Sequence, residues 1–368
     1  MKIVADQDIF QVAEYFSTHG KLVLMPGREI TRKHVSDVDV LLVRTITDVS
    51  SELLDNTSVK FVASASAGFD HIDTAYLNKQ GIRYVYAPGC NAAGVVDYFF
   101  AAMAWLHRGS NVSWFDKSVG VIGCGNVGSR LVTRLSKLGI NCLVHDPFLP
   151  LAHEHSSKLV SLDEALSCEI ATVHTSLTKS GTHPTFHLLG SEQLQQLSDN
   201  AVLVNASRGE VVDSDALKIV LKERPDLSAV LDVWEGEPYI SHELLELAAI
   251  GTPHIAGYSE NGKRRATEMV YSAFCEFAGI HPQSADSESG PLETPLSEEA
   301  LDENWVSSLL LQAYPINQDF LPCPVSAQAF ERLRNEYRFR KEFSDYSLSS
   351  KTQTPEQRRL GLALGFAE

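Results

Sequence analysis

The stretch Val119-Gly120-Val121-Ile122-Gly123-Cys124-Gly125-Asn126-Val127-Gly128 decides the fold of this chain. Its apolar beginning, Val119 to Ile122, is typical of a buried strand, and a helical pattern, Ser129 to Leu138, follows the last glycine directly. Glycines at these positions permit a tight turn, close approach of the backbone to a pyrophosphate, and packing of the helix against the strand. The N-terminus of that helix offers free N–H groups to the phosphates. The stretch therefore predicts a dinucleotide-binding unit.

Asp146 follows the next predicted strand, Asn141 to His145, where dinucleotide-binding folds hold the ribose. A carboxylate there accepts hydrogen bonds from both ribose hydroxyls and repels the 2′-phosphate of NADP, and Pro147-Phe148 supplies no arginine to offset that repulsion. NAD is therefore the predicted cofactor, and a mere loop cap is the alternative interpretation of Asp146. The predicted cofactor contacts of this region are Gly123, Gly125, Asn126, Val127, Gly128 and Asp146.

Short β-rich runs alternate with helical patterns, which is typical of parallel sheets because parallel neighbours need crossover connections. A first series comprises Lys2 to Ala5, Leu22 to Met25, Val40 to Arg44, Lys60 to Ser64 and Arg83 to Tyr86. A second series comprises Val119 to Ile122, Asn141 to His145, Ile170 to His174, Ala201 to Asn205, Ser228 to Asp232 and Ile250 to Thr252. A long apolar helix, Asn91 to His107, and a Gly/Ser/Asn break, Gly109 to Ser113, separate them. We expect an α/β protein with two Rossmann-like, doubly wound parallel-sheet domains.

The composition is that of an ordinary globular protein. The 368 residues are 44% hydrophobic and 21% charged, which excludes collagen-like, coiled-coil and wholly disordered classes. The formal net charge of −16 repels phosphate backbones and anionic lipids, so neither nucleic acid nor a membrane is an expected partner. The six cysteines form no C-x-x-C pair, and no metal site is expected. The N-terminal residues lack the apolar run of a signal peptide, so we expect a cytoplasmic protein.

The C-terminal part of the chain differs in composition. Residues Gln283 to Glu303 are rich in Ser, Pro and acids and contain no Lys or Arg, as in a solvated linker. Further on, the spacing of Phe330, Leu333 and Tyr337 predicts one apolar helix face within the basic segment Glu331 to Lys341. Nucleic-acid binding is the alternative use of that segment, but the net charge favours a solvated helix with an apolar seam against a partner subunit.

Four polar side chains stand at the ends of predicted strands: Thr175, Arg208, Asp232 and His254. In open α/β sheets, ligands bind outside the carboxyl ends of the strands, so we expect these residues to line one crevice. The permanently charged, planar guanidinium of Arg208 can grip a substrate carboxylate through two hydrogen bonds. The alternative for Arg208 is an exposed ion pair with Glu210, which contributes only about 0–1 kcal/mol.

Glu237 and His254 form a candidate acid–base pair. Glu237 precedes Pro238 and His254 follows Pro253, and proline restricts the backbone at both places. A carboxylate that accepts a hydrogen bond from an imidazole orients the ring and favours its charged form. Such a pair can donate or accept a proton near neutral pH. Glu235 is the alternative partner of His254, and spacing alone does not choose between the two glutamates.

Three further motifs accompany the glycine stretch: Asn205-Ala206-Ser207-Arg208-Gly209, Leu231-Asp232-Val233-Trp234-Glu235-Gly236-Glu237-Pro238 and Thr252-Pro253-His254-Ile255-Ala256-Gly257-Tyr258. In combination, these motifs resemble the D-2-hydroxyacid dehydrogenase family. Two more stretches are Ala65-Ser66-Ala67-Gly68-Phe69-Asp70-His71-Ile72-Asp73 and Ala87-Pro88-Gly89-Cys90-Asn91-Ala92. They are similar to those members of the family that act on 4-phospho-D-erythronate in pyridoxal phosphate (vitamin B6) biosynthesis.

The resemblance implies an enzyme that oxidises 4-phospho-D-erythronate by hydride transfer from C2 to NAD. It makes His254 the proton donor and acceptor, Glu237 its partner, and Arg208 the anchor of the substrate carboxylate. It implies NAD contacts by Asp146, Thr175, Ala206, Ser207, Asp232 and Gly257, and substrate contacts by Thr45, Ser66 and Tyr258. Thr45 stands where the family often has Ser, and Ser66 where it often has Thr, so both positions keep a hydroxyl. Arg44, beside Thr45, is a candidate contact for the phosphate.

The resemblance also implies how the chain is divided. Residues 1–97 and 255–282 would form a discontinuous substrate domain, residues 98–254 the NAD-binding domain, and residues 283–368 a linker and a smaller α+β dimerisation domain of a homodimer. Substrate would bind in the cleft between the first two domains. Two alternatives stay open: a dehydrogenase for another 2-hydroxy acid, such as glycerate or 3-phosphoglycerate, and an NAD-sensing scaffold without catalysis.

Overall fold

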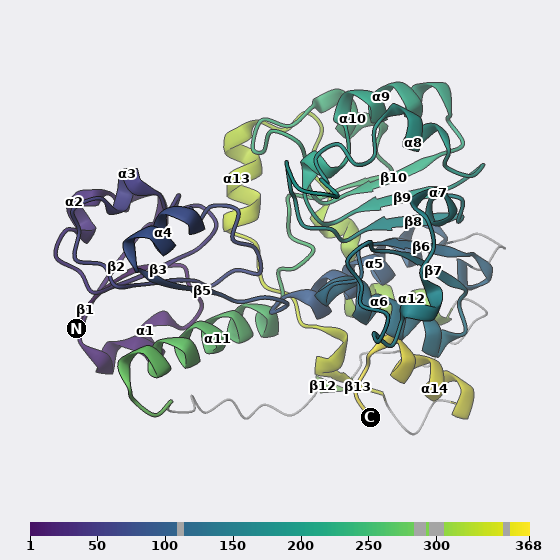
Figure 1. The fold of residues 1–368 in the computed structure, drawn as a ribbon. Coiled ribbons are helices and arrows are strands. Elements are labelled where there is room, and N and C mark those ends of the chain that lie inside the picture. Colours follow the sequence, from purple (N-terminus) through teal and green to yellow (C-terminus); the bar gives the residue numbers. More distant parts are fainter. Residues whose placement is uncertain (109–113, 283–291, 294–304, 349–353) are drawn as a thin grey trace. The chain divides into compact units, whose positions relative to one another are not determined.

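A computed structural model of the chain contains two compact units (Figure 1). The structure describes residues 1–108, 114–282, 292–293, 305–348 and 354–368. The first unit comprises residues 1–91 and 259–289, and the second comprises residues 92–258 and 290–368. The functional division into substrate, cofactor and dimerisation domains stays a prediction. The expected break at Gly109 to Ser113 lies outside the described residues.

The first unit is built on a five-stranded parallel sheet in the order β2-β1-β3-β4-β5. Its strands are β1 (Lys2–Asp6), β2 (Lys21–Met25), β3 (Val40–Val43), β4 (Phe61–Ser64) and β5 (Arg83–Tyr86). One face is covered by α1 (Val12–Phe16) and α11 (Glu260–Ala278), the other by α2 (Arg32–Val35), α3 (Ser51–Leu54) and α4 (Thr74–Gln80) (Figure 1). The topology reverses between β1 and β3, which makes their carboxyl ends the switch point of this sheet.

Both faces of this sheet are buried, which explains the uninterrupted apolar runs in its strands. In β3, Val40 and Leu42 belong to the core under α1 and α11, while Leu41 and Val43 belong to the core under the other helices. All four side chains are fully buried. The period of two along a strand therefore divides one apolar run between two cores.

The second unit contains a six-stranded parallel sheet in the order β11-β10-β9-β8-β6-β7. Its strands are β6 (Val119–Ile122), β7 (Cys142–His145), β8 (Ile170–Val173), β9 (Val202–Asn205), β10 (Ser228–Leu231) and β11 (Ile250–Gly251). Each strand of the two sheets lies within one residue of its predicted range at either end, and the predicted α/β fold with two doubly wound parallel sheets is confirmed. The switch point of this sheet lies between β6 and β8.

Helices cover both faces of the second sheet. One face carries α5 (Ala92–Leu106), α6 (Asn126–Leu138), α12 (Trp305–Ala313) and α14 (Pro355–Leu364). The other carries α7 (Leu162–Leu166), α8 (Ser191–Gln195), α9 (Ser214–Glu223), α10 (His242–Leu247) and α13 (Ala327–Asn335). The start of α9 is fixed by Asp213, whose carboxylate accepts hydrogen bonds from two first-turn N–H groups.

The C-terminal segment, of which the structure describes residues 292–293, 305–348 and 354–368, contacts a buried carboxylate of the second unit. Asp97 interrupts the apolar sequence of α5 and is only 1% exposed. Its carboxylate pairs with Arg134 of α6 and accepts a hydrogen bond of 2.9 Å from the backbone N–H of Phe343. The segment also pairs β12 (Leu292–Glu293) with β13 (Tyr346–Ser347). Apart from β12, the predicted linker Gln283 to Glu303 lies outside the described residues.

The predicted apolar face of the basic segment is wrong. Of its three members, Phe330 is buried in the core, but Leu333 is 37% exposed. Helix α13 ends at Asn335, so Tyr337 lies beyond it and donates a hydrogen bond of 2.8 Å to Asp319 instead. Because the helix stops before Tyr337, a helical period no longer relates that ring to Phe330.

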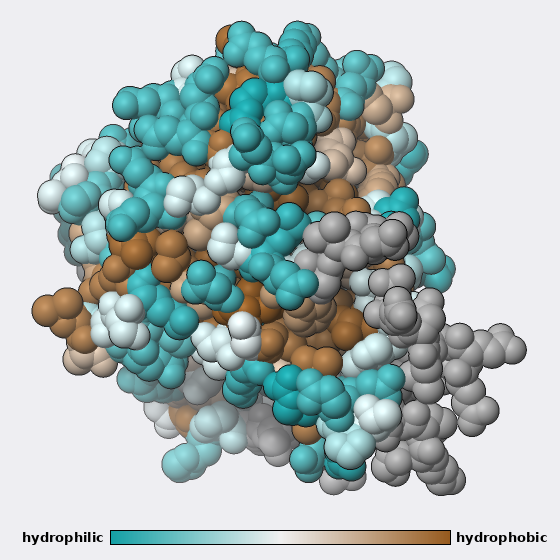
Figure 2. All heavy atoms as spheres, turned by 90° about the vertical axis from the view of Figure 1, so that its right-hand side faces the viewer, coloured by the Kyte–Doolittle hydropathy of each residue, from teal (hydrophilic) through white to brown (hydrophobic). Residues whose placement is uncertain are grey.

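One face of the molecule is drawn by hydropathy in Figure 2. Hydrophilic residues make up much of that face, and hydrophobic residues are visible between them (Figure 2). Within the described parts of the chain, no helix combines the length and apolar character needed to cross a membrane.

Candidate active site

A cavity of about 470 Å³ opens beside the carboxyl ends of β6, β7 and β8, at the switch point of the second sheet. We call it the cofactor cavity. Its lining consists of Gly123, Gly125, His145, Asp146, Pro147, Phe148, His174, Thr175, Ser176, Thr178, Thr182, His183, Pro184, Thr185 and Leu188. Four predicted cofactor contacts, Gly123, Gly125, Asp146 and Thr175, therefore surround one space.

The glycines of the fingerprint differ in what they do. A Cβ at Gly128 would lie 2.0 Å from the carbonyl oxygen of Gly123, so only glycine lets α6 pack this closely on the preceding turn. A Cβ at Gly125 would meet nothing within 4 Å, and its backbone borders the open cavity. Helix α6 begins at Asn126 without a side-chain cap, which leaves the N–H groups around Asn126 and Val127 for a phosphate.

Asp146 is held rigidly at the edge of the cofactor cavity. One carboxylate oxygen accepts a hydrogen bond of 2.8 Å from the N–H of Cys124, and the other accepts one of 2.9 Å from the N–H of Phe148. These two hydrogen bonds support the alternative in which Asp146 caps a loop, but Asp146 also lines the cofactor cavity. A carboxylate accepts about four hydrogen bonds, so both uses are compatible.

Two buried polar atoms in the cavity wall lack partners within the described part of the chain: the hydroxyl of Thr175 and Nδ1 of His174. Burial lowers the pKa of His174 to about 4, so its ring is neutral at neutral pH. Buried polar groups without hydrogen bonds are costly, and a polar ligand would satisfy them. Together with the exposed glycine backbone and the fixed carboxylate, these atoms fit a dinucleotide. His174 was not among the predicted cofactor contacts.

The ends of three neighbouring strands, β9, β10 and β11, carry the predicted catalytic side chains Arg208, Glu237 and His254. We call this region the β9–β11 edge. Nδ1 of His254 lies 2.8 Å from Oε2 of Glu237, and Oε1 of Glu237 accepts a hydrogen bond of 2.9 Å from the N–H of Trp234. Glu235, the alternative partner, contacts His187 at 2.9 Å instead. The structure therefore pairs His254 with Glu237.

Charge and backbone geometry both hold this pair. Burial alone would raise the pKa of Glu237, but the neighbouring His254 and Arg334 and the hydrogen bonds to the carboxylate lower it overall. His254 itself has a φ of +59°, in the left-handed region that non-glycine residues occupy at a cost. Its N–H donates a hydrogen bond of 2.7 Å to the carbonyl of Asp232, which stabilises this conformation.

Asp232 organises the loop that follows His254. Its carboxylate is 1% exposed and accepts hydrogen bonds from the N–H groups of Ile255 (2.7 Å) and Ala256 (2.8 Å). The hydroxyl of Thr252 donates to it as well, at 2.7 Å. The buried carboxylate therefore fixes the turn leading to Gly257. Contacts of Asp232 and Gly257 with the cofactor stay predictions.

Asn205, which was not predicted, shapes the loop that carries Arg208. Its side-chain oxygen accepts hydrogen bonds from the N–H and hydroxyl of Ser207, and its amide donates to the carbonyl of Arg208 at 2.9 Å. A Cβ at Gly209 would lie 2.1 Å from the backbone of Trp234, so glycine lets this loop approach the loop after β10. The roles of Ala206 and Ser207 toward the cofactor stay predictions.

The predicted substrate contacts Thr45 and Ser66 follow the adjacent strands β3 and β4 in the first unit. Thr45 is exposed, and the hydroxyl of Ser66 donates 2.8 Å to the carbonyl of Gly68. Arg44 is bound by two carboxylates, at 2.7 Å from Asp6 and 2.6 Å from Asp8. A phosphate at Arg44 would have to compete with both acids, which weighs against that prediction.

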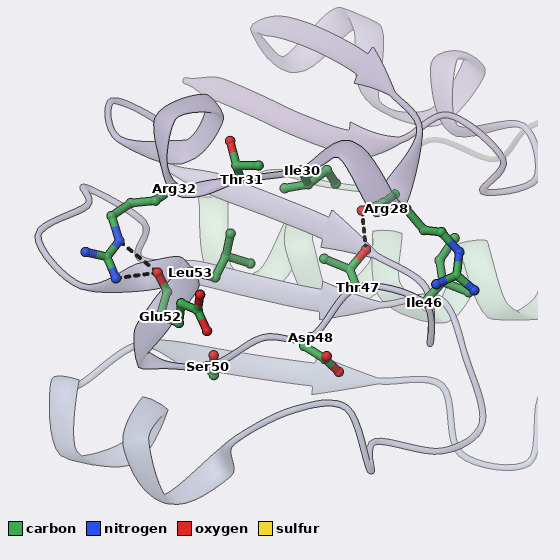
Figure 3. Close-up of a pocket in the computed structure, with 11 residues that line it drawn as sticks. Arg28, Ile30, Thr31, Arg32, Ile46, Thr47, Asp48, Ser50, Glu52 and Leu53 are labelled. Atoms are coloured by element: carbon green, nitrogen blue, oxygen red, sulfur yellow. Dashed lines mark hydrogen bonds between the residues drawn. The ribbon is translucent and has the colours of Figure 1, made fainter. Parts of the chain in front are cut away.

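A further pocket, of about 570 Å³, lies in the first unit at the carboxyl ends of β2 and β3 (Figure 3). Its lining consists of Gly27, Arg28, Ile30, Thr31, Arg32, Ile46, Thr47, Asp48, Ser50, Glu52 and Leu53. The hydroxyl of Thr47 donates to the carbonyl of Gly27, and Nε of Arg32 to that of Glu52 (Figure 3). Thr45, Ser66 and Arg44 are not in this lining.

Arg340 of the C-terminal segment stabilises the loop after His254, a contact that the sequence did not predict. Its guanidinium donates hydrogen bonds to the carbonyls of Ile255 (3.0 Å), Tyr258 (3.1 Å) and Ala256. It also donates to the carbonyl of Gly94 at 2.8 Å. An arginine is suited to gather several carbonyls because it carries five donors and no acceptor. The one signal in the sequence is the position of Arg340 in an aromatic stretch.

Comparison with known proteins assigns the chain to a family. Residues 96–256 match the model of the D-isomer specific 2-hydroxyacid dehydrogenase NAD-binding domain. The erythronate-4-phosphate dehydrogenase of Cellvibrio japonicus is 41% identical over 384 residues, covering 100% of this chain and 99% of that protein. The enzyme of the same name from Pseudomonas syringae pv. tomato is also 41% identical, covering 99% of each chain.

Solved structures show the same fold. The NAD-bound 3-phosphoglycerate dehydrogenase of Entamoeba histolytica has a TM-score of 0.65 at 24% identity, covering 78% of this chain and 99% of that one. The D-lactate dehydrogenase of Aquifex aeolicus, complexed with NAD and lactic acid, has a TM-score of 0.66 at 24% identity, covering 76% and 96%. The chain therefore belongs to the erythronate-4-phosphate dehydrogenases, within the D-isomer specific 2-hydroxyacid dehydrogenases, and is an NAD-dependent oxidoreductase.

Proposed function

We propose that this enzyme oxidises 4-phospho-D-erythronate to 2-oxo-3-hydroxy-4-phosphobutanoate with NAD, a step in pyridoxal 5′-phosphate biosynthesis. The names of the full-length relatives support the substrate. The observation that carries the chemistry is the 2.8 Å contact between Nδ1 of His254 and the carboxylate of Glu237. That contact orients the imidazole and leaves Nε2 for a substrate proton.

In the proposed reaction, His254 accepts the proton of the C2 hydroxyl while C2 loses a hydride. The bound NAD supplies the hydride acceptor. Glu237 stabilises the imidazolium that results, because its carboxylate is ionised and fixed by the N–H of Trp234. Arg208 binds the substrate carboxylate through its planar guanidinium and holds C2 in place. General-base help of this kind accelerates proton transfer by about 10²–10⁴-fold.

The cofactor contacts follow from the cavity. Asp146 would accept hydrogen bonds from the ribose hydroxyls, the first turn of α6 would bind the pyrophosphate, and Thr175 would use its buried hydroxyl. Further proposed contacts are Ala206, Ser207, Asp232 and Gly257 for the cofactor, and Thr45, Ser66 and Tyr258 for the substrate.

We also propose a homodimer formed through the C-terminal segment. Leu333 and Phe339 support this assignment because they are 37% and 38% exposed, although both are large and apolar. Light scattering of the purified protein gives the subunit number. A monomer at micromolar concentration would contradict the proposal.

A spectrophotometric NADH assay tests the substrate. 4-Phospho-D-erythronate, unphosphorylated erythronate, glycerate and 3-phosphoglycerate are compared at saturating NAD. The proposal expects the highest kcat/KM for 4-phospho-D-erythronate, because binding energy from the remote phosphate is used in the transition state. If unphosphorylated erythronate gave the same kcat/KM as 4-phospho-D-erythronate, the proposed substrate would be wrong, but the assignment as a 2-hydroxyacid dehydrogenase would stand. Binding of NAD without turnover of any 2-hydroxy acid, also with alternative electron acceptors, would instead support the sensing scaffold.

A further inference from the structure

We propose that Arg334, in the C-terminal helix α13, is a positioning residue for the Glu237–His254 pair: its guanidinium fixes the Glu237 carboxylate and the Tyr258 hydroxyl and disfavours protonation of the pair. This inference rests on the proposed function, in which that pair handles the substrate proton. Neither the glycine fingerprint nor the three catalytic motifs contain this residue.

Arg334 contacts the pair directly. Its Nη1 lies 3.7 Å from Oε2 of Glu237, the same oxygen that lies 2.8 Å from Nδ1 of His254. Its Nε donates a hydrogen bond of 3.2 Å to the hydroxyl of Tyr258. One planar guanidinium therefore spans two neighbours of His254, one on the loop after β10 and one on the loop after β11. The compact ammonium of a lysine could not hold both in this geometry.

The helix holds Arg334 in this place. Phe330 stands one helical turn before it, and residues four apart share a helix face. The Phe330 ring is only 1% exposed, within the core of the second unit, so the same face carries Arg334 inward. The hydroxyl of Ser326 caps the start of the helix by accepting a hydrogen bond from the N–H of Ala329. The Arg334 side chain is 19% exposed, whereas Arg332 on the same helix is an exposed residue.

The charges around the pair explain what Arg334 does. Among the described residues, the charged groups that act on the Glu237 carboxylate are His254 and Arg334, and those that act on Arg334 include Glu237, Tyr258 and Asp232. The Glu237 carboxylate interacts with both the imidazole of His254 and the guanidinium of Arg334. An opposite charge within about 4–6 Å shifts a carboxyl pKa down by about 1–3 units. With Arg334 in place, the carboxylate stays ionised and the imidazole finds a less negative neighbour, so the pair binds a proton less readily.

Removal of Arg334 should therefore shift the pH dependence of oxidation. The reaction needs the pair without its extra proton, so activity falls as pH drops and the pair becomes protonated. In Arg334→Met this acidic limb of the kcat profile should move to higher pH by about one unit. At neutral pH, kcat should fall about 10-fold, while the Kd for NAD changes less than about twofold. Arg334→Lys should restore the acidic limb but only part of kcat, because it keeps the charge and loses the fork.

The matched control is Arg332→Met, which removes an exposed arginine from the same helix and should leave both quantities unchanged. A second readout does not depend on any substrate. The imidazole NMR signal that disappears in His254→Gln reports protonation of the pair, and its titration midpoint should rise by about one unit in Arg334→Met. If wild-type protein fails to oxidise 4-phospho-D-erythronate, the proposed substrate fails, whereas the NMR titration still decides the role of Arg334.

Three outcomes would overturn the proposal: an unshifted midpoint in Arg334→Met, an equal shift in Arg332→Met, or a midpoint in Arg334→Lys that matches Arg334→Met. If Arg334→Met does not fold, as judged by circular dichroism, the lysine variant and Arg334→Gln carry the same comparison. A wild-type midpoint in folded Arg334→Gln would then reject the role.

Discussion

The cofactor cavity and the β9–β11 edge belong to the same sheet, but they are prepared for their ligands in opposite ways. In the cavity, the Thr175 hydroxyl and Nδ1 of His174 are buried and lack partners within the described residues. At the edge, the carboxylates of Asp232 and Glu237 accept hydrogen bonds from the backbone and from side chains. The cavity therefore leaves polar groups for a ligand to satisfy, whereas the edge fixes its side chains before any substrate arrives.

This difference predicts that the two regions can be damaged separately. Substitutions at the edge should change turnover with little effect on NAD binding. Substitutions in the cavity should change cofactor affinity or stability and leave the pH dependence of turnover unchanged.

The largest expected effect is that of His254→Ala. The variant loses the group that accepts the substrate proton, so kcat should fall about 10²–10⁴-fold. The Kd for NAD, measured by fluorescence titration, should stay within about twofold of wild type. Unaltered turnover would remove His254 from the proposed mechanism, and a large loss of NAD affinity would show that the two regions are not separable.

The next largest effect is on the free energy of unfolding of the protein, through the buried His174 of the cofactor cavity. Burial lowers the pKa of His174 from 6.5 to about 4, so between these values the unfolded state binds more protons than the folded state. The contribution of His174 is fully present above pH 6.5 and is lost as pH falls toward 4, by up to about 3 kcal/mol. Urea unfolding at several pH values should show this loss in the wild type and a weaker one in His174→Gln. Parallel pH profiles for both proteins would contradict it.

Arg208→Lys tests the substrate anchor at the edge. The charge is kept but the bidentate fork is lost, so kcat/KM for the 2-hydroxy acid should fall by about 10- to 100-fold. The affinity for NAD should change less. Steady-state kinetics at saturating NAD measure the effect, and a kcat/KM equal to that of wild type would exclude a bidentate contact at this position.

The smallest effect is expected for Asp146→Asn in the cavity. Loss of the charge weakens hydrogen bonds to the ribose, so KM for NAD should rise about 10-fold, and the preference for NAD over NADP should shrink. The pH dependence of kcat should match that of wild type. An unchanged ratio of kcat/KM for the two cofactors would leave Asp146 with only its hydrogen bonds to Cys124 and Phe148.

The same two regions differ in how far the sequence predicts them. The cavity is built from short segments, so the glycine stretch, Asp146 and Thr175 could be predicted from local patterns. Strands were predictable for the same reason, because each buried apolar run forms its own strand. The choice between Glu235 and Glu237 required the structure, since both glutamates have suitable spacing and only their neighbours differ.

The contacts of the C-terminal segment could not be predicted. Arg340 lies 82 residues from Tyr258 in the sequence, and Arg334 lies 76 from the same tyrosine. A local pattern carries no information about which distant carbonyl or carboxylate a buried arginine meets. The helical spacing of Phe330, Leu333 and Tyr337 predicts one apolar face only if a single helix contains all three residues. Helix α13 ends at Asn335, and the spacing carries no information about that end. The contacts of Arg334 and Arg340 depend on long-range packing, and the surroundings of Tyr337 depend on where α13 ends, so both required the structure.

The most direct measurement of the proposed chemistry is a crystal structure of the enzyme with NAD and an unreactive analogue of the 2-hydroxy acid. We expect Nε2 of His254 within about 2.6–3.2 Å of the analogue's C2 oxygen, with Nδ1 still on Glu237 and Arg208 on the analogue's carboxylate. An imidazole turned away from C2 in that complex, or a carboxylate bound elsewhere, would contradict the proposed roles of these three residues.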